Sequence, residues 1–151
     1  MSRKPLALLG GYLVVLLVLT FWPFDGFSGT TPVDLRLHAF RTINFALRKG
    51  PESHQFLILI GNVVAFVPLG LLVPLIVRRY SFAAVFVSAF AVSLAIEIGQ
   101  LAVSIALGFA YRTADIDDVI VNVCGALIGY AVFVALALAT RTDSPTGAGT
   151  T

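Results

Sequence analysis

The sequence predicts an all-α polytopic membrane bundle of four transmembrane helices plus one amphipathic interfacial helix in the first loop. Two observations predict this class. First, only 12% of the 151 residues are charged and the mean hydropathy is +0.96, whereas about a quarter charged is usual for soluble domains. Second, four apolar runs each approach or exceed the roughly 20 helical residues that cross a hydrocarbon core. At this length we expect one domain.

The apolar runs predict the four spans and leave a polar tail. The first run follows Arg3 and Lys4 as in a signal peptide, but no small-residue cleavage pattern follows it, so we expect an uncleaved span. We assign residues 1–140 to the transmembrane domain and residues 141–151, which are rich in Gly and Thr, to a disordered tail. The predicted spans cover residues 6–22, 56–77, 82–107 and 119–139.

The first loop carries its own helix signals. Thr31 is a candidate N-cap, Pro32 suits the first helical position, and Gly50 followed by Pro51 predicts the end. Apolar residues recur at helical spacing between them, which predicts an amphipathic helix over residues 32–49 lying on the membrane surface. Its polar residues touch lipid headgroups in one interpretation and cover a binding site in the other. The polar residues concerned are Asp34, His38 and Arg41.

The third span contains an unusual polar face. Ser93, Glu97 and Gln100 fall at i, i+4 and i+7, so they share one side of a helix. A carboxylate in hydrocarbon is unfavourable by about 2.5–3.5 kcal/mol even on insertion scales, so we expect Glu97 to face protein partners.

The second and fourth spans offer such partners. Asn62 begins a stripe of polar and small residues in the second span, and Asp115, Asp118 and Asn122 share a face if the last helix begins near residue 114. Acids in a first turn are also favoured by the helix dipole, so part of this cluster needs no function. Gly125 and Gly129 form a small-residue seam suited to close helix contact, including contact in a homodimer.

These polar groups enter the membrane from the same face. Glu97 lies 18 residues beyond Arg79, or roughly 27 Å along the helix, and Asn62 and the Asp residues start from that far side. We therefore predict a polar pocket in one half of the bilayer. Its residues are Asn62, Glu97, Gln100, Arg112, Asp115, Asp118 and Asn122, with Asp34, His38 and Arg41 as a contribution from the loop.

The basic residues predict membrane topology rather than nucleic-acid binding. The sequence pI is about 9.0, but the ten Lys and Arg residues are spread along the chain and mostly flank the spans. Five of these residues lie on each side of the membrane in the predicted topology. Those near the termini and at residues 78–79 adjoin short segments, where the tendency of Lys and Arg to stay in the cytoplasm is strongest. We therefore expect both termini in the cytoplasm and the pocket on the outer side. Cys124 stands alone in an apolar helix and predicts no disulfide.

Three blocks carry a family resemblance. Residues 61–74 (GNVVAFVPLGLLVP), 93–100 (SLAIEIGQ) and 112–130 (RTADIDDVIVNVCGALIGY) together resemble the VanZ-like membrane family. The resemblance implies a small bundle of four or five spans and places the seven pocket residues at the family's polar motif positions. The family's founding member is linked to low-level resistance to the glycopeptide teicoplanin. An Asp-Lys…His pattern of many members appears here only as Asp34-Leu35-Arg36-Leu37-His38.

Several functions remain open on the sequence. The favoured one is a non-enzymatic protein of the cell membrane that contacts membrane lipids and binds a lipid-linked cell-wall precursor or a glycopeptide, without a cofactor or bound metal. Asn and Gln suit such ligands because each amide both donates and accepts hydrogen bonds. The alternatives are an enzyme acting on a lipid headgroup through Glu97 or a cation held by Asp115, Asp117 and Asp118, a proton-linked carrier, and a purely structural polar network.

Overall fold

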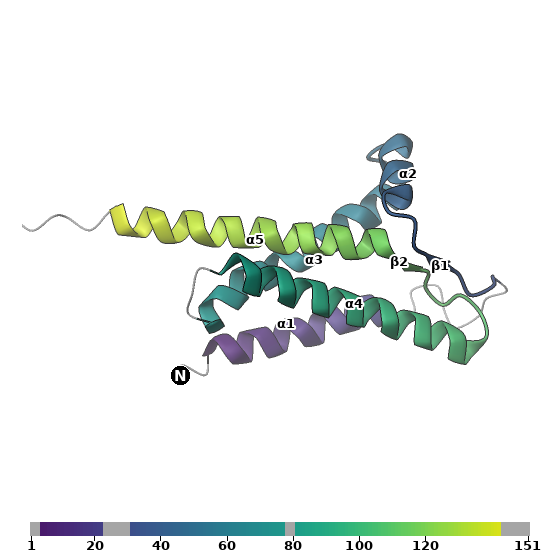
Figure 1. Cartoon of the computed structure of the whole chain (residues 1–151), viewed down its shortest axis with the longest axis horizontal. Coiled ribbons are helices and arrows are strands. Elements are labelled where there is room, and N and C mark those ends of the chain that lie inside the picture. The colour runs from purple at the N-terminus through teal and green to yellow at the C-terminus, as the bar shows by residue number, and fades with distance from the viewer. Residues whose placement is uncertain (1–3, 23–30, 78–80, 143–151) are drawn as a thin grey trace, which may run out of the picture.

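The computed structural model describes residues 4–22, 31–77 and 81–142, with side chains described as far as residue 140. In these residues four long helices run side by side, a short helix lies at one end, and two very short strands link two loops (Figure 1). The helices are α1 (Lys4–Phe21), α2 (Arg41–Lys49), α3 (His54–Val77), α4 (Phe82–Leu107) and α5 (Ile116–Thr142), and the strands are β1 (Leu35–Arg36) and β2 (Ala114–Asp115).

The four long helices confirm the predicted spans. Each is long and apolar enough to cross a membrane, and each begins and ends within three residues of the predicted bounds. The chain is therefore a multi-pass membrane protein. Residues 141 and 142 of the predicted tail form the last turn of α5, and the rest of that tail lies outside the described residues. Arg3, Arg78 and Arg79, on which the predicted orientation depends, also lie outside them.

The connectivity brings four helix ends together. Helices α1 and α4 run in one direction and α3 and α5 in the other, so α1 and α4 end where α3 and α5 begin (Figure 1). The short helix α2 and the strand pair lie at this same end. The polar half of each span is therefore placed at one end of the bundle, as the sequence predicts.

A glycine seam joins α3 to α5. A Cβ atom built on Gly125 would overlap the backbone carbonyl of Val63, and one built on Gly129 would overlap that of Val67. From the other side, a Cβ on Gly70 would overlap the carbonyl of Ala126. Close backbone approach of this kind is the usual role of small residues between membrane helices. The seam that we predicted for close contact is thus filled by α3 of the same chain.

The interior away from the polar end is apolar and tightly packed. Phe66 and Leu69 of α3 and Val85 and Ala89 of α4 are almost completely inaccessible to solvent. Helix α3 continues through Pro68 and Pro74 without ending. Membrane helices tolerate such prolines because neighbouring groups can satisfy the freed carbonyls.

The helix of the first loop exists, but its predicted beginning is wrong. We predicted residues 32–49, whereas α2 begins at Arg41 and ends at the predicted stop, where the Gly50 N–H donates to the Ala46 carbonyl. Residues 35 and 36, which we expected to be helical, instead pair in parallel with Ala114 and Asp115. The Thr31 carbonyl accepts a bond from the Ala110 N–H at 2.8 Å, so the segment is extended along the loop before α5.

Asp117 explains the shifted start. Its buried carboxylate accepts bonds from the backbone N–H groups of Phe40, Thr42 and Ile43, at 2.5, 2.7 and 3.1 Å. These are the free donors at the beginning of a helix, and a side chain usually caps them from the residue just before it. Here the cap comes from 74 to 77 residues away in sequence. Phe40 adopts a left-handed conformation, with φ of 64°, where the extended loop turns into α2.

Candidate functional site

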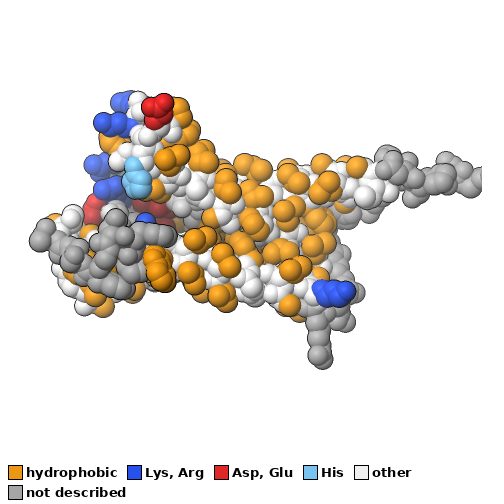
Figure 2. Space-filling view, turned by 180° about the vertical axis from the view of Figure 1, so that it is seen from behind, with side chains coloured by type: hydrophobic (Ala, Val, Ile, Leu, Met, Phe, Trp, Pro, Cys, Tyr) orange, Lys and Arg blue, Asp and Glu red, His pale blue; other side chains and the backbone are white. Residues whose placement is uncertain are grey.

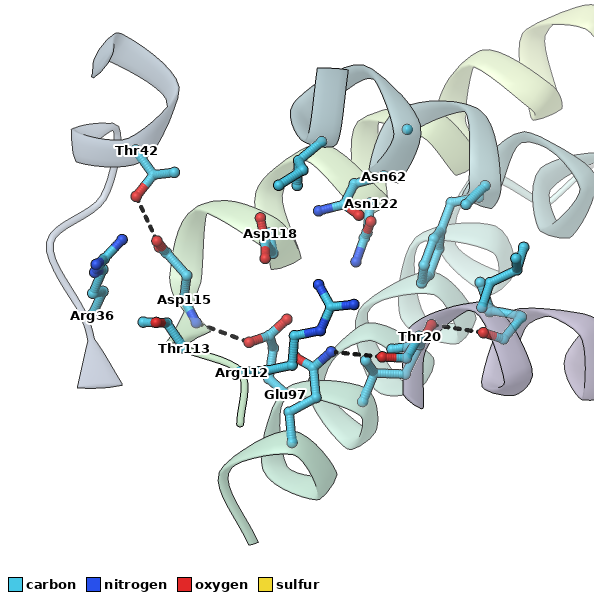
Figure 3. Close-up of a pocket in the computed structure, with 18 of the residues that line it drawn as sticks. Thr20, Arg36, Thr42, Asn62, Glu97, Arg112, Thr113, Asp115, Asp118 and Asn122 are labelled. Atoms are coloured by element: carbon cyan, nitrogen blue, oxygen red, sulfur yellow. Dashed lines mark hydrogen bonds between the residues drawn. The ribbon is translucent and has the colours of Figure 1, made fainter. Parts of the chain in front are cut away.

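A cavity of about 510 Å³ lies at the polar end of the bundle, and all seven predicted pocket residues line it. Acidic and basic side chains gather at this end, while the rest of the visible surface is mostly apolar (Figure 2). The lining comes from the end of α1, the beginning of α3, the end of α4, the loop before α5 and the beginning of α5 (Figure 3). The structure thus brings together lining residues as far apart in the sequence as Leu16 and Asn122.

Glu97 faces the cavity and not the lipid. Only 7% of the residue is exposed, and one carboxylate oxygen accepts a bond from the backbone N–H of Asp115 at 2.8 Å. This bond joins α4 to β2, so the carboxylate both closes the end of the bundle and lines its cavity. The predicted partners were side chains of the second and fourth spans, whereas the bond that forms is to the backbone just before the fourth.

Asn122 carries a buried polar atom that no described residue satisfies. Its amide nitrogen donates to the hydroxyl of Ser93 at 2.8 Å, which links α5 to α4. Its carbonyl oxygen is buried and, among the described residues, has no hydrogen-bond partner. A buried oxygen left unpaired is unfavourable by about 1–3 kcal/mol. Since Asn122 lines the cavity, this oxygen is an acceptor available to a group that enters it.

Arg112 supplies a positive charge to the cavity. Figure 3 shows its guanidinium in the space between Glu97, Asp118 and Asn122, and it attracts the Asp118 carboxylate. Asn62 of α3 faces the same carboxylate from across the cavity (Figure 3). Donors and acceptors of both charge signs therefore surround one space.

Gln100 continues the polar face toward α1. Its amide nitrogen donates to the backbone carbonyl of Thr20 at 3.4 Å, and Thr20 itself lines the cavity. The Thr20 hydroxyl is turned back to the carbonyl of Leu16. The predicted face of Ser93, Glu97 and Gln100 is thus buried along its whole length against other helices.

Ser104 and Tyr111 hold the loop that carries Arg112. The Ser104 hydroxyl is fully buried and accepts bonds from the backbone N–H groups of Tyr111 and Arg112 at 3.2 and 3.3 Å. The Tyr111 hydroxyl donates to the carbonyl of Phe21 at the end of α1. Neither residue is among those that the sequence predicts for the site, since a lone Ser and a lone Tyr in an apolar setting carry no pattern.

The loop contributes to the cavity through residues other than those predicted. Asp34 and His38 are exposed and are not among the lining residues, and Arg41 lines a neighbouring cavity instead. Arg36 and Thr42 line the cavity in their place, and the Thr42 hydroxyl donates to the Asp115 carboxylate. We predicted Asp34 and His38 at the site on the assumption of a helix over residues 32–49. The helix begins only at Arg41, and residues 35 and 36 before it are in a strand. Their predicted role in binding stays a prediction.

The three clustered acids differ in what they do. Both Asp117 oxygens are engaged by the backbone of α2, and Asp115 accepts bonds from the Asp117 N–H and from Thr42. Asp118 is half-buried and faces the cavity. Among the residues that the structure describes, no group of three His, Cys, Asp or Glu side chains is placed to share a metal ion.

The comparison with protein families agrees with the resemblance seen in the sequence. The model of the VanZ/LLP1 family matches residues 9–138, which include every helix described above almost completely. No curated protein and no solved structure matches the chain. With 130 of its 151 residues matched, the chain belongs to the VanZ/LLP1 family.

Proposed function

We propose that this protein binds the polar headgroup of a lipid-linked cell-envelope component in the cavity at the polar end of its bundle. The observation that carries the proposal is the carbonyl oxygen of Asn122, which is buried and has no partner among the described residues. Asn122 as a whole is only 4% exposed, and it lines a cavity of about 510 Å³. An unpaired buried acceptor in an open polar space is explained if a ligand supplies the missing donor.

The other lining groups indicate the chemistry of such a ligand. The amides of Asn62, Gln100 and Asn122 can both donate and accept, Glu97 accepts, and Arg112 donates. Sugars and peptides present donors and acceptors side by side, which suits this mixture. Apolar residues of α1 and α3 complete the lining, among them Leu16, Ile58 and Phe66. A hydroxyl-rich or amide-rich headgroup on an apolar chain fits both kinds of surface.

Orientation completes the proposal. We place the protein in the cell membrane with both termini in the cytoplasm, so that the cavity opens outside, where envelope components are exposed. The Lys and Arg residues next to the shortest segments support this orientation.

A cysteine introduced at Glu52 in a Cys124→Ser background should react with an impermeant maleimide in intact cells. Protection of that cysteine until the cells are opened would reverse the orientation.

The binding test uses two cavity variants. We expect Glu97→Gln and Asn122→Ala to weaken binding of a short-chain polyprenyl diphosphate disaccharide by about tenfold or more. Glu97→Gln replaces one acceptor oxygen by a donor and removes the negative charge, and Asn122→Ala removes the buried amide. Protein in nanodiscs is titrated with the labelled lipid, and teicoplanin is tested in parallel. Glu52→Gln is the matched control, since Glu52 is exposed and lines neither cavity. Unchanged affinity for both ligands in both cavity variants would refute the proposal.

A further inference from the structure

We propose that three arginines beside the cavity form a phosphate-binding site for the lipid whose headgroup enters it. This inference rests on the proposed function and names a chemical group of the ligand. The arginines are Arg36 of β1 and Arg41 and Arg48 of α2.

A second cavity of about 610 Å³ brings the three arginines together. Its other lining residues are Thr42, Asn44, Phe45 and Gln55, so no acidic side chain among the described residues lines it. Arg41 and Arg48 are seven residues apart, which is close to two helical turns, so they lie on the same face of α2. Three guanidinium groups around one space repel each other unless an anion lies between them.

Two of the three guanidinium charges are not neutralised within the described part of the chain. Arg36 forms a salt bridge with Asp34 at 3.0 Å, in which both side chains are about half exposed. Arg41 and Arg48 form no salt bridge to any described residue. Arg is the residue best suited to phosphate, because its planar group presents paired N–H donors to two oxygens. The cavity therefore has the charge and the donors for a phosphate or diphosphate.

The two cavities are continuous in their lining. Arg36, Thr42 and Gln55 line both, and Figure 3 shows Arg36 beside Thr42 at the side of the first cavity next to α2. One ligand can therefore place its sugar or peptide against Glu97 and Asn122 and its phosphate against the arginines. Lipid-linked envelope precursors carry a phosphate between the polyprenyl chain and the headgroup, which matches this order of surfaces.

The test uses a ligand that has the phosphate and lacks the headgroup. Full-length protein in phosphatidylcholine nanodiscs is titrated with labelled farnesyl diphosphate, and farnesol serves as the ligand without phosphate. We expect Arg41→Gln and Arg48→Gln each to weaken binding about fivefold, the equivalent of about 1 kcal/mol per arginine. Arg48→Lys should retain part of the affinity. Farnesol should bind at least tenfold more weakly than the diphosphate.

Two controls separate a built site from a diffuse positive field. Lys49→Gln removes the same charge next to Arg48, but Lys49 is directed over the Phe45 ring and does not line the cavity. We expect it to change affinity less than twofold. Asp34→Asn frees Arg36 and should tighten binding, a result that misfolding cannot produce. An equal loss in Lys49→Gln, or unchanged affinity in the Arg41/Arg48 double variant, would overturn the site.

The source of the phosphate is separated by competition. Displacement by inorganic pyrophosphate as strong as by farnesyl diphosphate would overturn the lipid assignment in favour of a free anion, and equal displacement by phosphatidylglycerol would overturn it in favour of bulk lipid. The arginines and the inner cavity can also fail independently. If Glu97→Gln weakens disaccharide-lipid binding while the arginine variants leave farnesyl diphosphate binding unchanged, this inference fails and the proposed function stands.

Discussion

The two ends of this bundle are built on different principles. At the apolar end, helices meet through glycine backbones and apolar side chains, and in the α3–α5 seam the Cβ positions of Gly70, Gly125 and Gly129 lie against backbone carbonyls of the facing helix. At the polar end, single side chains bind particular backbone groups of another segment: Asp117 those at the beginning of α2, Glu97 that of β2, and Ser104 those of the loop after α4. Packing thus holds the first end together, while directed hydrogen bonds shape the second into a cavity.

The largest expected effect breaks the polar end at Asp117. In Asp117→Asn, one of the two acceptor oxygens becomes an N–H donor, which in either orientation of the amide faces a backbone donor: that of Phe40, or those of Thr42 and Ile43. We expect the free energy of opening α2 to fall by about 2–4 kcal/mol. Hydrogen exchange of residues 40–49 measures it, and exchange in α3 and α4 should stay near the wild-type rate. Asp34→Asn, in an exposed pair, is the control. Equal protection of α2 in both variants would contradict the cap.

The next effect breaks the apolar end at Gly125. The Cβ of Gly125→Ala meets the carbonyl of Val63, so we expect a loss of about 1–3 kcal/mol in the free energy of unfolding. Denaturation in mixed detergent micelles measures this loss. Gly10→Ala is the matched control, because a Cβ on Gly10 meets no atom within 4 Å and Ala favours a helix. A Gly125→Ala protein as stable as Gly10→Ala would show that the seam is loose.

A third variant asks whether the polar end is built for stability or for binding. Ser93→Ala/Asn122→Leu removes the hydrogen bond between α4 and α5 together with the unpaired carbonyl oxygen. Replacing both partners by apolar groups is often nearly neutral, so we expect unfolding within about 1 kcal/mol of wild type and loss of headgroup binding. Unfolding in detergent and lipid titration are measured on the same preparation. A strong loss of stability would instead make this pair structural.

The smallest expected effect comes from removing one hydroxyl in each of two regions, at Tyr12 between α1 and α3 and at Tyr111 at the polar end. Tyr12 donates to the carbonyl of Ala65 at 2.9 Å, and Tyr111 donates to that of Phe21. Tyr12→Phe should lower the free energy of unfolding by about 0.6 kcal/mol, the average for hydrogen bonds between membrane helices, with binding unchanged. Tyr111→Phe should also weaken headgroup binding, since Tyr111 adjoins Arg112. Equal affinities in the two variants would argue against positioning of Arg112 by this contact.

The sequence predicted the apolar part of the fold well because apolar length and helical period are local signals. Four runs of roughly the right length identified all four spans, and the rule that a buried acid needs partners predicted that Glu97, Asn62 and Asn122 would converge. Connectivity did the rest, since consecutive spans run in opposite directions and alternate spans therefore begin at the same face.

The parts that could not be predicted depend on contacts between distant segments. Thr31, Pro32 and Asp34 form a sound local start signal, yet the helix begins at Arg41 because the three-donor cap of Asp117 and the pairing of β1 with β2 are more favourable. Arg36 and Thr42 reach the cavity as a result of that same displacement. No local pattern marks Asp117 as the cap, because acids in a first helical turn are common.

The distant origin of the α2 cap has a consequence for the order in which the protein matures. A ribosome produces residues 31–49 long before Asp115 and Asp117, so the strand partner and the capping carboxylate do not yet exist when the loop emerges. Three hydrophobic segments can enter the bilayer during that interval. The arginine-bearing loop can take its final shape only once Asp115 and Asp117 at the beginning of the fourth segment have been synthesised, so this end of the bundle is completed last.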